Sequence, residues 1–170
     1  MMRSIPKVLC FLAASAYLNP AHAAPFRSEK GYSLQAPAGW KLTRGFMSSD
    51  AAFAAPARNG FAANINVVVT PLPPGATLAQ AKAQTATMLA QTFSGFKLLG
   101  QRNVSIAGGR GLKTEATFRT GTPPRNLRLL QVVTVHNNRA YFFTATALTA
   151  SYSAYQGAFQ RALDSVKLTK

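Results

Sequence analysis

The sequence predicts an α+β domain, a mostly antiparallel β-sheet flanked by helices. Three observations support this fold class. Residues from 96 to 150 contain four consecutive strand-like segments with short separators. Two segments, at 77–95 and 153–166, show helical periodicity. The strands are grouped together rather than alternating with helices, which favours hairpin connections over parallel crossovers.

The domain opens with a strand–turn–strand pattern. GYSLQA at 31–36 alternates apolar and polar residues, as a half-buried strand does, and PAG at 37–39 supplies turn residues. WKLTRGF at 40–46 resumes the alternation. Residues 46–60 have no clear period, so we expect a loop there, with at most a short irregular strand.

A central strand and a helix follow. ANINVVVTPL at 63–72 is a β-branched run that predicts an inner strand, and the prolines after it end the strand. Thr77 and Gln80 then match a capping box. Apolar residues recur at helical spacing up to Gly95, so we expect this helix to cover one face of the sheet.

The four strands after residue 96 are separated by AGG, GTPP and NN. The pair Asn137–Asn138 suits a tight two-residue hairpin, because asparagine tolerates the left-handed conformation. Ser153 and Gln156 form a second capping-box pattern at the start of the last helix. One face of that helix is apolar, carrying Tyr155, Phe159, Leu163 and Val166.

The first 23 residues predict a cleaved signal peptide. Arg3 and Lys7 precede the apolar run VLCFLAASAYL, and AHA at 21–23 provides small residues before a cleavage site. We therefore expect residues 24–170 to form a single domain in the periplasm or outside the cell. The alternative is an uncleaved membrane anchor, but no later segment reaches the ~20 apolar residues of a stable membrane span.

Charge is the most unusual property of the composition. Of 19 Lys and Arg residues, two lie in the predicted signal peptide, leaving 17 against four acids, a net charge of about +13. Such an excess favours an acidic protein or an anionic envelope component as partner. Export argues against nucleic acid. The alternative is a solvated basic surface without a specific role.

Catalytic groups are scarce. Cys10 lies in the signal peptide, so the mature chain would have no disulfide, thiolate metal site or cysteine nucleophile. His136 would be its only histidine, at the end of a strand, where a surface position is the simpler interpretation. Glu115 lies two residues from Lys113, which predicts an ion pair. We expect no catalytic residue, no metal site and no cofactor. The alternative is a hydrolase using Ser or Tyr near His136.

Two further sets of residues are candidates for function or structure. Arg119, Arg125 and Arg128 flank the GTPP turn and predict an anion-binding edge, the alternative being a solvated loop. Trp40, the single tryptophan, follows the PAG turn. We expect it to be a structural anchor that packs on a helix or the sheet, rather than a platform for a ligand.

The chain resembles the PsbP/DcrB-like family over residues 30–169. The resemblance rests on these segments, in order: GYSLQAPAGWKL, NINVVV, TLAQAKAQTATML, VSIAGGRGLKTEATF, LLQVVTVHNNRAYFFTATA and FQRALDSVKL. It implies an α/β/α sandwich and a function without catalysis. Members include accessory proteins of photosynthetic complexes, bacterial periplasmic proteins and the type VI secretion Eag-type chaperones. That chaperone branch usually lacks a signal peptide, in contrast to this chain.

Two functions follow as hypotheses. The first is an exported accessory module that docks on an anionic protein or envelope partner through basic loops. The second is a chaperone or carrier that binds an apolar peptide or lipid in a groove between sheet and helices. The second hypothesis requires an exposed apolar groove, which a structure would reveal.

Overall fold

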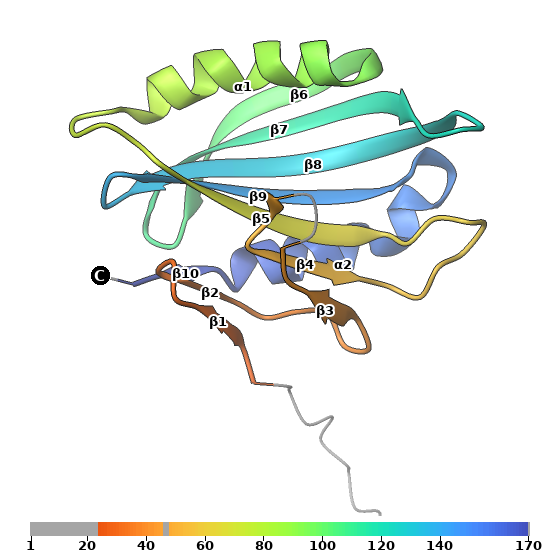
Figure 1. The fold of residues 1–170 in the computed structure, drawn as a ribbon, viewed down its shortest axis with the longest axis horizontal. Coiled ribbons are helices and arrows are strands. Elements are labelled where there is room, and N and C mark those ends of the chain that lie inside the picture. The colour runs from red at the N-terminus through yellow and green to blue at the C-terminus, as the bar shows by residue number, and fades with distance from the viewer. Residues whose placement is uncertain (1–23, 46–47, 170) are drawn as a thin grey trace, which may run out of the picture.

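The structure, a computed structural model, describes residues 24–45 and 48–169 (Figure 1). The predicted signal peptide, residues 1–23, lies outside the described residues. Across the described ranges, none of the helices has the length and apolar character needed to span a membrane.

The main body is an antiparallel sheet of seven strands (Figure 1). From edge to edge its strands are β3 (Lys41–Thr43), β4 (Ala51–Ala54), β5 (Asn64–Pro71), β9 (Arg139–Leu148), β8 (Arg125–His136), β7 (Gly109–Thr120) and β6 (Ser94–Ile106). Strands β6 to β9 are successive antiparallel neighbours, which confirms the four consecutive strands expected after residue 96. β5 lies between β4 and β9, the inner position that its β-branched sequence predicts.

A second sheet brings the two ends of the described chain together. It contains β1 (Phe26–Ser28), β2 (Tyr32–Leu34) and β10 (Lys167–Leu168), with β2 in the middle and both pairings antiparallel. Tyr32 and Leu34 are fully buried against the larger sheet. The small sheet therefore belongs to the core of the domain.

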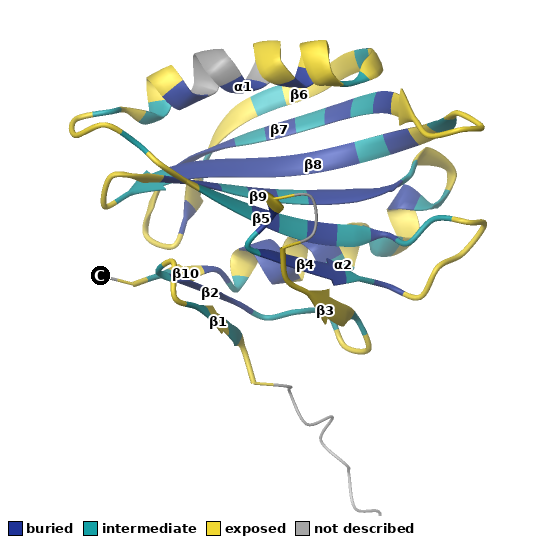
Figure 2. Ribbon diagram, in the orientation of Figure 1, coloured by how far each residue is buried: buried dark blue, intermediate teal, exposed yellow. Residues whose placement is uncertain are grey.

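Helices lie on both faces of the seven-stranded sheet, which confirms the predicted sandwich (Figure 1). α1 (Leu78–Thr92) covers one face, where Leu89 packs with Phe118 and Leu129 in a small cluster. α2 (Tyr152–Asp164) follows a 3-10 turn, η2 (Thr149–Ser151), and covers the opposite face beside the small sheet. The larger core cluster lies on this second side (Figure 2).

The predicted local signals at α1 and at the β8–β9 turn are confirmed. The Thr77 hydroxyl accepts a hydrogen bond from the Gln80 amide, and the Gln80 side chain accepts one from the Thr77 amide at 2.9 Å. Both backbone amides would otherwise lack an intrahelical acceptor. Asn137 and Asn138 have φ values of 47° and 54°, the left-handed conformation that a tight hairpin requires.

Two expectations need comment. The short strand allowed for within the loop 46–60 is present as β4, which is paired on both sides; its Ala51, Ala52 and Phe53 are all buried, so no polar alternation marks it. The capping box expected at Ser153 and Gln156 does not form, because the 3-10 turn leads directly into a helix that begins at Tyr152.

Candidate binding groove beneath helix α1

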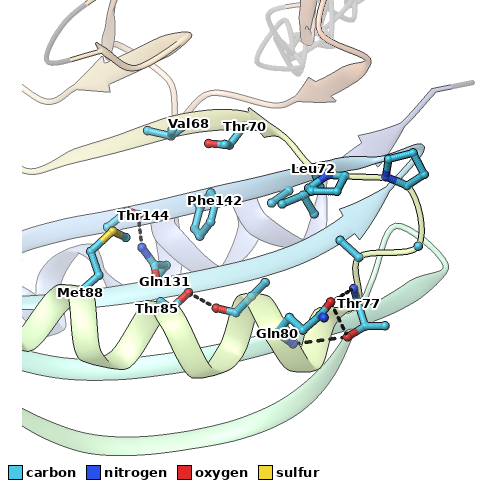
Figure 3. Close-up of a pocket in the computed structure, with 16 residues that line it drawn as sticks. Val68, Thr70, Leu72, Thr77, Gln80, Thr85, Met88, Gln131, Phe142 and Thr144 are labelled. Carbon is cyan, nitrogen blue, oxygen red and sulfur yellow. Dashed lines mark hydrogen bonds between the residues drawn. The ribbon is translucent and has the colours of Figure 1, made fainter.

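A groove of about 680 Å³ lies between α1 and the part of the sheet that α1 leaves uncovered (Figure 3). The Pro73–Pro74 loop before the helix lines one end. The floor is formed by alternate residues of three neighbouring strands: Val68 and Thr70 of β5, Ala140, Phe142 and Thr144 of β9, and Gln131 of β8.

The groove exists because α1 is packed off-centre. Leu89 and Phe93, near the C-terminal end of the helix, pack with residues of β7 and β8. β5 and β9 continue the sheet beyond that contact. Their residues Val68 and Phe142 face the groove and are only half-buried. A contiguous, partly exposed apolar surface of this kind marks a binding site more often than isolated exposed apolar residues do.

None of the described side chains that line the groove is charged. This is notable in a chain whose formal net charge is +15. A charged ligand entering the groove would lose hydration without gaining an opposite charge, which is costly. An uncharged, largely apolar ligand loses nothing of this kind, and the burial of its surface is favourable.

A row of polar side chains crosses the sheet beneath α1. We call it the polar row; it consists of Gln101, Thr114, Gln131, Thr144 and Asn66, which are register partners on five neighbouring strands. The Gln101 amide donates to the Thr114 hydroxyl at 3.1 Å, and the Gln131 amide donates to the Thr144 hydroxyl at 2.9 Å.

Gln131, a member of the polar row, has an unused hydrogen-bond acceptor at the groove. Its side chain is only 5% exposed, and its Oε1 has no hydrogen-bond partner among the described residues. In Figure 3 the side chain lies on the groove floor beside Thr144, beneath the helix residue Thr85. Thr85 itself uses its hydroxyl to donate to the Ala81 carbonyl at 2.7 Å.

The three arginines predicted as an anion-binding edge lie on two faces of the sheet. Arg128 and Asn126 are two residues apart on β8 and point to the same face, and Arg119 of β7 is the register partner of Asn126. Because Arg128 contacts Tyr152 of α2, both arginines lie on the face that α2 covers. Arg125 is three residues before Arg128 on the same strand, and side chains alternate between faces along a strand, so Arg125 lies on the other face. Its guanidinium donates to the Gly60 carbonyl at 2.6 Å.

Arg128 is already occupied within the protein. It donates to Glu115 at 2.7 Å and stacks on the Tyr152 ring at 4.4 Å. The predicted Lys113–Glu115 ion pair also forms, at 3.4 Å. Burial alone would raise the pKa of Glu115, but the hydrogen bond from Arg128 and the charge of Lys113 outweigh it, so that pKa lies below its ordinary value. Arg119, in contrast, is exposed.

Trp40 and His136 lie outside the groove lining. The Trp40 ring meets Tyr155 and Phe159 of α2 edge-on, with centroids 6.2 and 6.0 Å away, and the residue is half-buried.

His136 is half-buried at the end of β8, and its Nε2 has no hydrogen-bond partner in the part of the chain that the structure describes. Within that same part, no three His, Cys, Asp or Glu side chains are placed to hold a metal ion.

Sequence reasoning missed the residues of the groove. The polar row could have been noticed at Gln131, the one amide in the buried run LLQVV. The groove itself has no sequence signal, because it depends on where α1 rests on the sheet.

Comparisons with known proteins agree with this architecture. The family model described as DcrB matches residues 33–165. No curated protein matches the chain in sequence. Three solved structures share its fold at low sequence identity. LpqN of Mycobacterium tuberculosis, whose structure is described as involved in cell envelope biogenesis, is 16% identical with a TM-score of 0.67, covering 86% of this chain and 90% of LpqN.

The cyanobacterial PsbP (CyanoP) of Synechocystis sp. PCC 6803 is 15% identical with a TM-score of 0.65, covering 92% of this chain and 98% of CyanoP. The protein of unknown function PA94 of Pseudomonas aeruginosa, described as a putative regulator, is 19% identical with a TM-score of 0.60, covering 82% of this chain and 92% of PA94. The link to type VI secretion chaperones stays an expectation of the resemblance. The family match spans most of the chain, and the neighbours share its fold. The chain belongs to the DcrB family, with a PsbP-like fold.

Proposed function

We propose that this protein is a non-catalytic binding module of the cell envelope, and that it holds an uncharged apolar ligand in the groove beneath α1. The observation that carries the proposal is the groove itself: about 680 Å³, without a charged side chain among its described lining residues. Its size lies within the ~300–1,000 Å³ typical of small-molecule sites.

The envelope location is supported by two independent considerations. The N-terminal sequence predicts export, and the fold neighbour LpqN is described as involved in cell envelope biogenesis. Apolar ligands are plentiful at membranes and poorly soluble in water, so a carrier or chaperone there needs a shielded apolar site.

Docking on an anionic partner is the second candidate function, and the distribution of charge supports it. Among the described residues, ion pairs engage Lys30, Lys113 and Arg128, and the remaining basic side chains have no carboxylate partner. Arg119 is one of these exposed cations. We propose that the basic surface draws the protein to an acidic protein or anionic envelope component, while the groove takes the ligand.

The groove is tested with N-phenyl-1-naphthylamine, an uncharged apolar dye whose fluorescence rises in apolar surroundings. We expect saturable binding to the wild-type protein that 0.5 M NaCl does not weaken, since the described groove lining offers no charge. Thr70→Trp places an indole on the groove floor and should weaken binding about tenfold or more.

Thr43→Trp is the matched control, because Thr43 is exposed on β3 and does not line the groove. It should bind the dye like the wild type. Equal binding by the Thr70→Trp and Thr43→Trp variants would contradict the proposal, as would binding that disappears at high salt.

A further inference from the structure

We propose that Gln131 makes the groove selective for a single apolar chain that carries a hydroxyl group, such as a lipid-derived hydroxyacyl chain. This inference rests on the proposed function, since it identifies the class of ligand that the groove would take.

The first step of the argument is the unpaired atom of Gln131. A primary amide offers both a donor group and an acceptor, and here the donor group is bonded to Thr144 while Oε1 has no partner among the described residues. At 5% exposure, water replaces that partner poorly. Buried polar atoms are nearly always paired, so an orphaned acceptor on the floor of a groove points to a ligand donor.

The second step concerns the surroundings of Gln131. Its neighbours on β8, Leu129 and Val133, face the same side of the sheet and are fully buried. A leucine at position 131 would continue that apolar surface at no polar cost. The amide is instead held in place by Thr144, whose hydroxyl fixes one end and leaves the other free. That arrangement is the one expected of a positioned recognition group.

The third step concerns the charge of the partner group. A carboxylate cannot donate to Oε1, and an ammonium group would be buried without a counter-charge, since the described lining has none. A hydroxyl is uncharged and can donate to Oε1. It is therefore the simplest group that completes the amide without introducing a charge.

The fourth step concerns the shape of the ligand. An α-helical peptide is about 10–12 Å across with its side chains, so the 680 Å³ of the groove would enclose less than about two helical turns. An extended peptide would bring an amide and a carbonyl at every residue, far more polar groups than the floor can pair. A thin alkyl chain with one hydroxyl fits both limits.

The experiment measures displacement of N-phenyl-1-naphthylamine by 1-decanol and by its methyl ether, which keeps the chain and removes the donor. The preference is the ratio of the two displacement constants, and it is compared between variants so that the different water solubilities of the two chains cancel. Gln131→Met removes the amide while keeping a similar length. We expect it to lower the preference for the alcohol about tenfold, which is the effect of losing one hydrogen bond.

Gln101→Met is the matched control, the same substitution in the same polar row but outside the groove lining, and it should keep the wild-type preference. Thr144→Val is a second route to the same test if Gln131→Met fails to fold. It removes the hydroxyl that positions the amide and should also lower the preference.

The outcomes separate the two proposals. An unchanged preference in Gln131→Met, or in Thr144→Val where that variant replaces it, overturns the role of Gln131 while the groove still binds. Failure of the dye and both chains to bind the wild-type protein overturns the proposed function, and with it this inference.

Discussion

Among single residues, Asp50 holds the N-terminal strands to the main sheet. Its Oδ2 accepts hydrogen bonds from the Ser28 hydroxyl at 2.5 Å and the Tyr32 hydroxyl at 2.9 Å, and Lys30 lies 3.4 Å from Oδ1. Burial would by itself raise the pKa of Asp50, but the hydrogen bonds and the lysine charge outweigh it, so that pKa lies below its ordinary 3.8. Burial, together with Asp50, also raises the pKa of Tyr32 above its usual range.

Asp50→Ala should destabilise the protein at pH 7 by about 1–3 kcal/mol, because it leaves the hydroxyls of buried Tyr32 and half-buried Ser28 without their acceptor. Since the pKa of Asp50 is lower in the folded than in the unfolded chain, its contribution is complete above its ordinary value of 3.8. The contribution is lost as pH falls through the lower, folded value. Urea unfolding at pH 7 and pH 3 should therefore show a smaller difference between wild type and variant at pH 3.

Glu29→Ala is the control for Asp50→Ala, because Glu29 is an exposed acid in the adjacent turn. It should change the free energy of unfolding little at either pH. A gap between wild type and Asp50→Ala that stays constant down to pH 3 would contradict the proposed linkage.

Trp40→Ala tests whether this residue acts as an anchor or as a ligand platform. A fully buried aromatic costs about 3–5 kcal/mol when truncated, and the half-buried Trp40 should cost about 2 kcal/mol. Urea unfolding followed by circular dichroism measures the change. Trp40→Phe, which keeps a ring against Phe159, should recover part of the loss. Dye binding should be unchanged, and loss of binding with full stability would favour the platform instead.

At the scale of elements, the two helices begin in contrasting ways. α1 has a complete capping box at Thr77, whereas the N-cap residue of α2, Ser151, makes no capping hydrogen bond to its helix. α1 also forms one wall of the groove, and its first turn lies at the groove end. The stability of that first turn therefore bears directly on the shape of the site.

Thr77→Ala should lower the free energy of unfolding by about 1 kcal/mol, the typical effect of losing an N-cap. Ser151→Ala, the same kind of substitution at the start of α2, should cost measurably less, since no cap is lost. Chemical denaturation of both variants checks the difference. Equal losses would show that the Thr77 box contributes nothing specific to α1.

Elements with a clear local signal could be predicted from the sequence, and elements without one could not be placed. The strands after residue 96 and the start of α1 were predicted because periodicity and capping are local signals. β4 was expected only as a short irregular strand without bounds, because Ala51, Ala52 and Phe53 are all buried and alternation disappears. The groove was expected only as one hypothesis, because the position of a helix on a sheet is decided by packing between distant residues such as Leu89 and Leu129.

At the scale of the whole molecule, a large excess of positive charge is combined with a groove whose described lining is uncharged. The formal net charge is +15, while the described groove lining has no ionised side chain. The two features should respond differently to salt, because exposed charges are screened over ~10 Å at 0.1 M and ~3 Å at 1 M. Surface attraction and ligand binding can therefore be measured separately.

A protein comprising residues 24–170 should sediment with vesicles that contain anionic phospholipid and not with purely zwitterionic vesicles. Because the attraction is electrostatic, 0.5 M NaCl should abolish it. The groove variant Thr70→Trp should bind these vesicles like the wild type, since the substitution leaves the charge unchanged. Equal sedimentation with both kinds of vesicle, or resistance to salt, would contradict a role for the basic surface.

The small sheet determines how the protein would be oriented on a support. β1 and β10 flank the same strand, β2, on the side of the large sheet opposite α1 (Figure 1). A tether attached near Ala24 or near Thr169 would therefore hold the molecule by the same side. Either attachment leaves α1 and the groove that it lines on the far side of the large sheet from the anchoring surface.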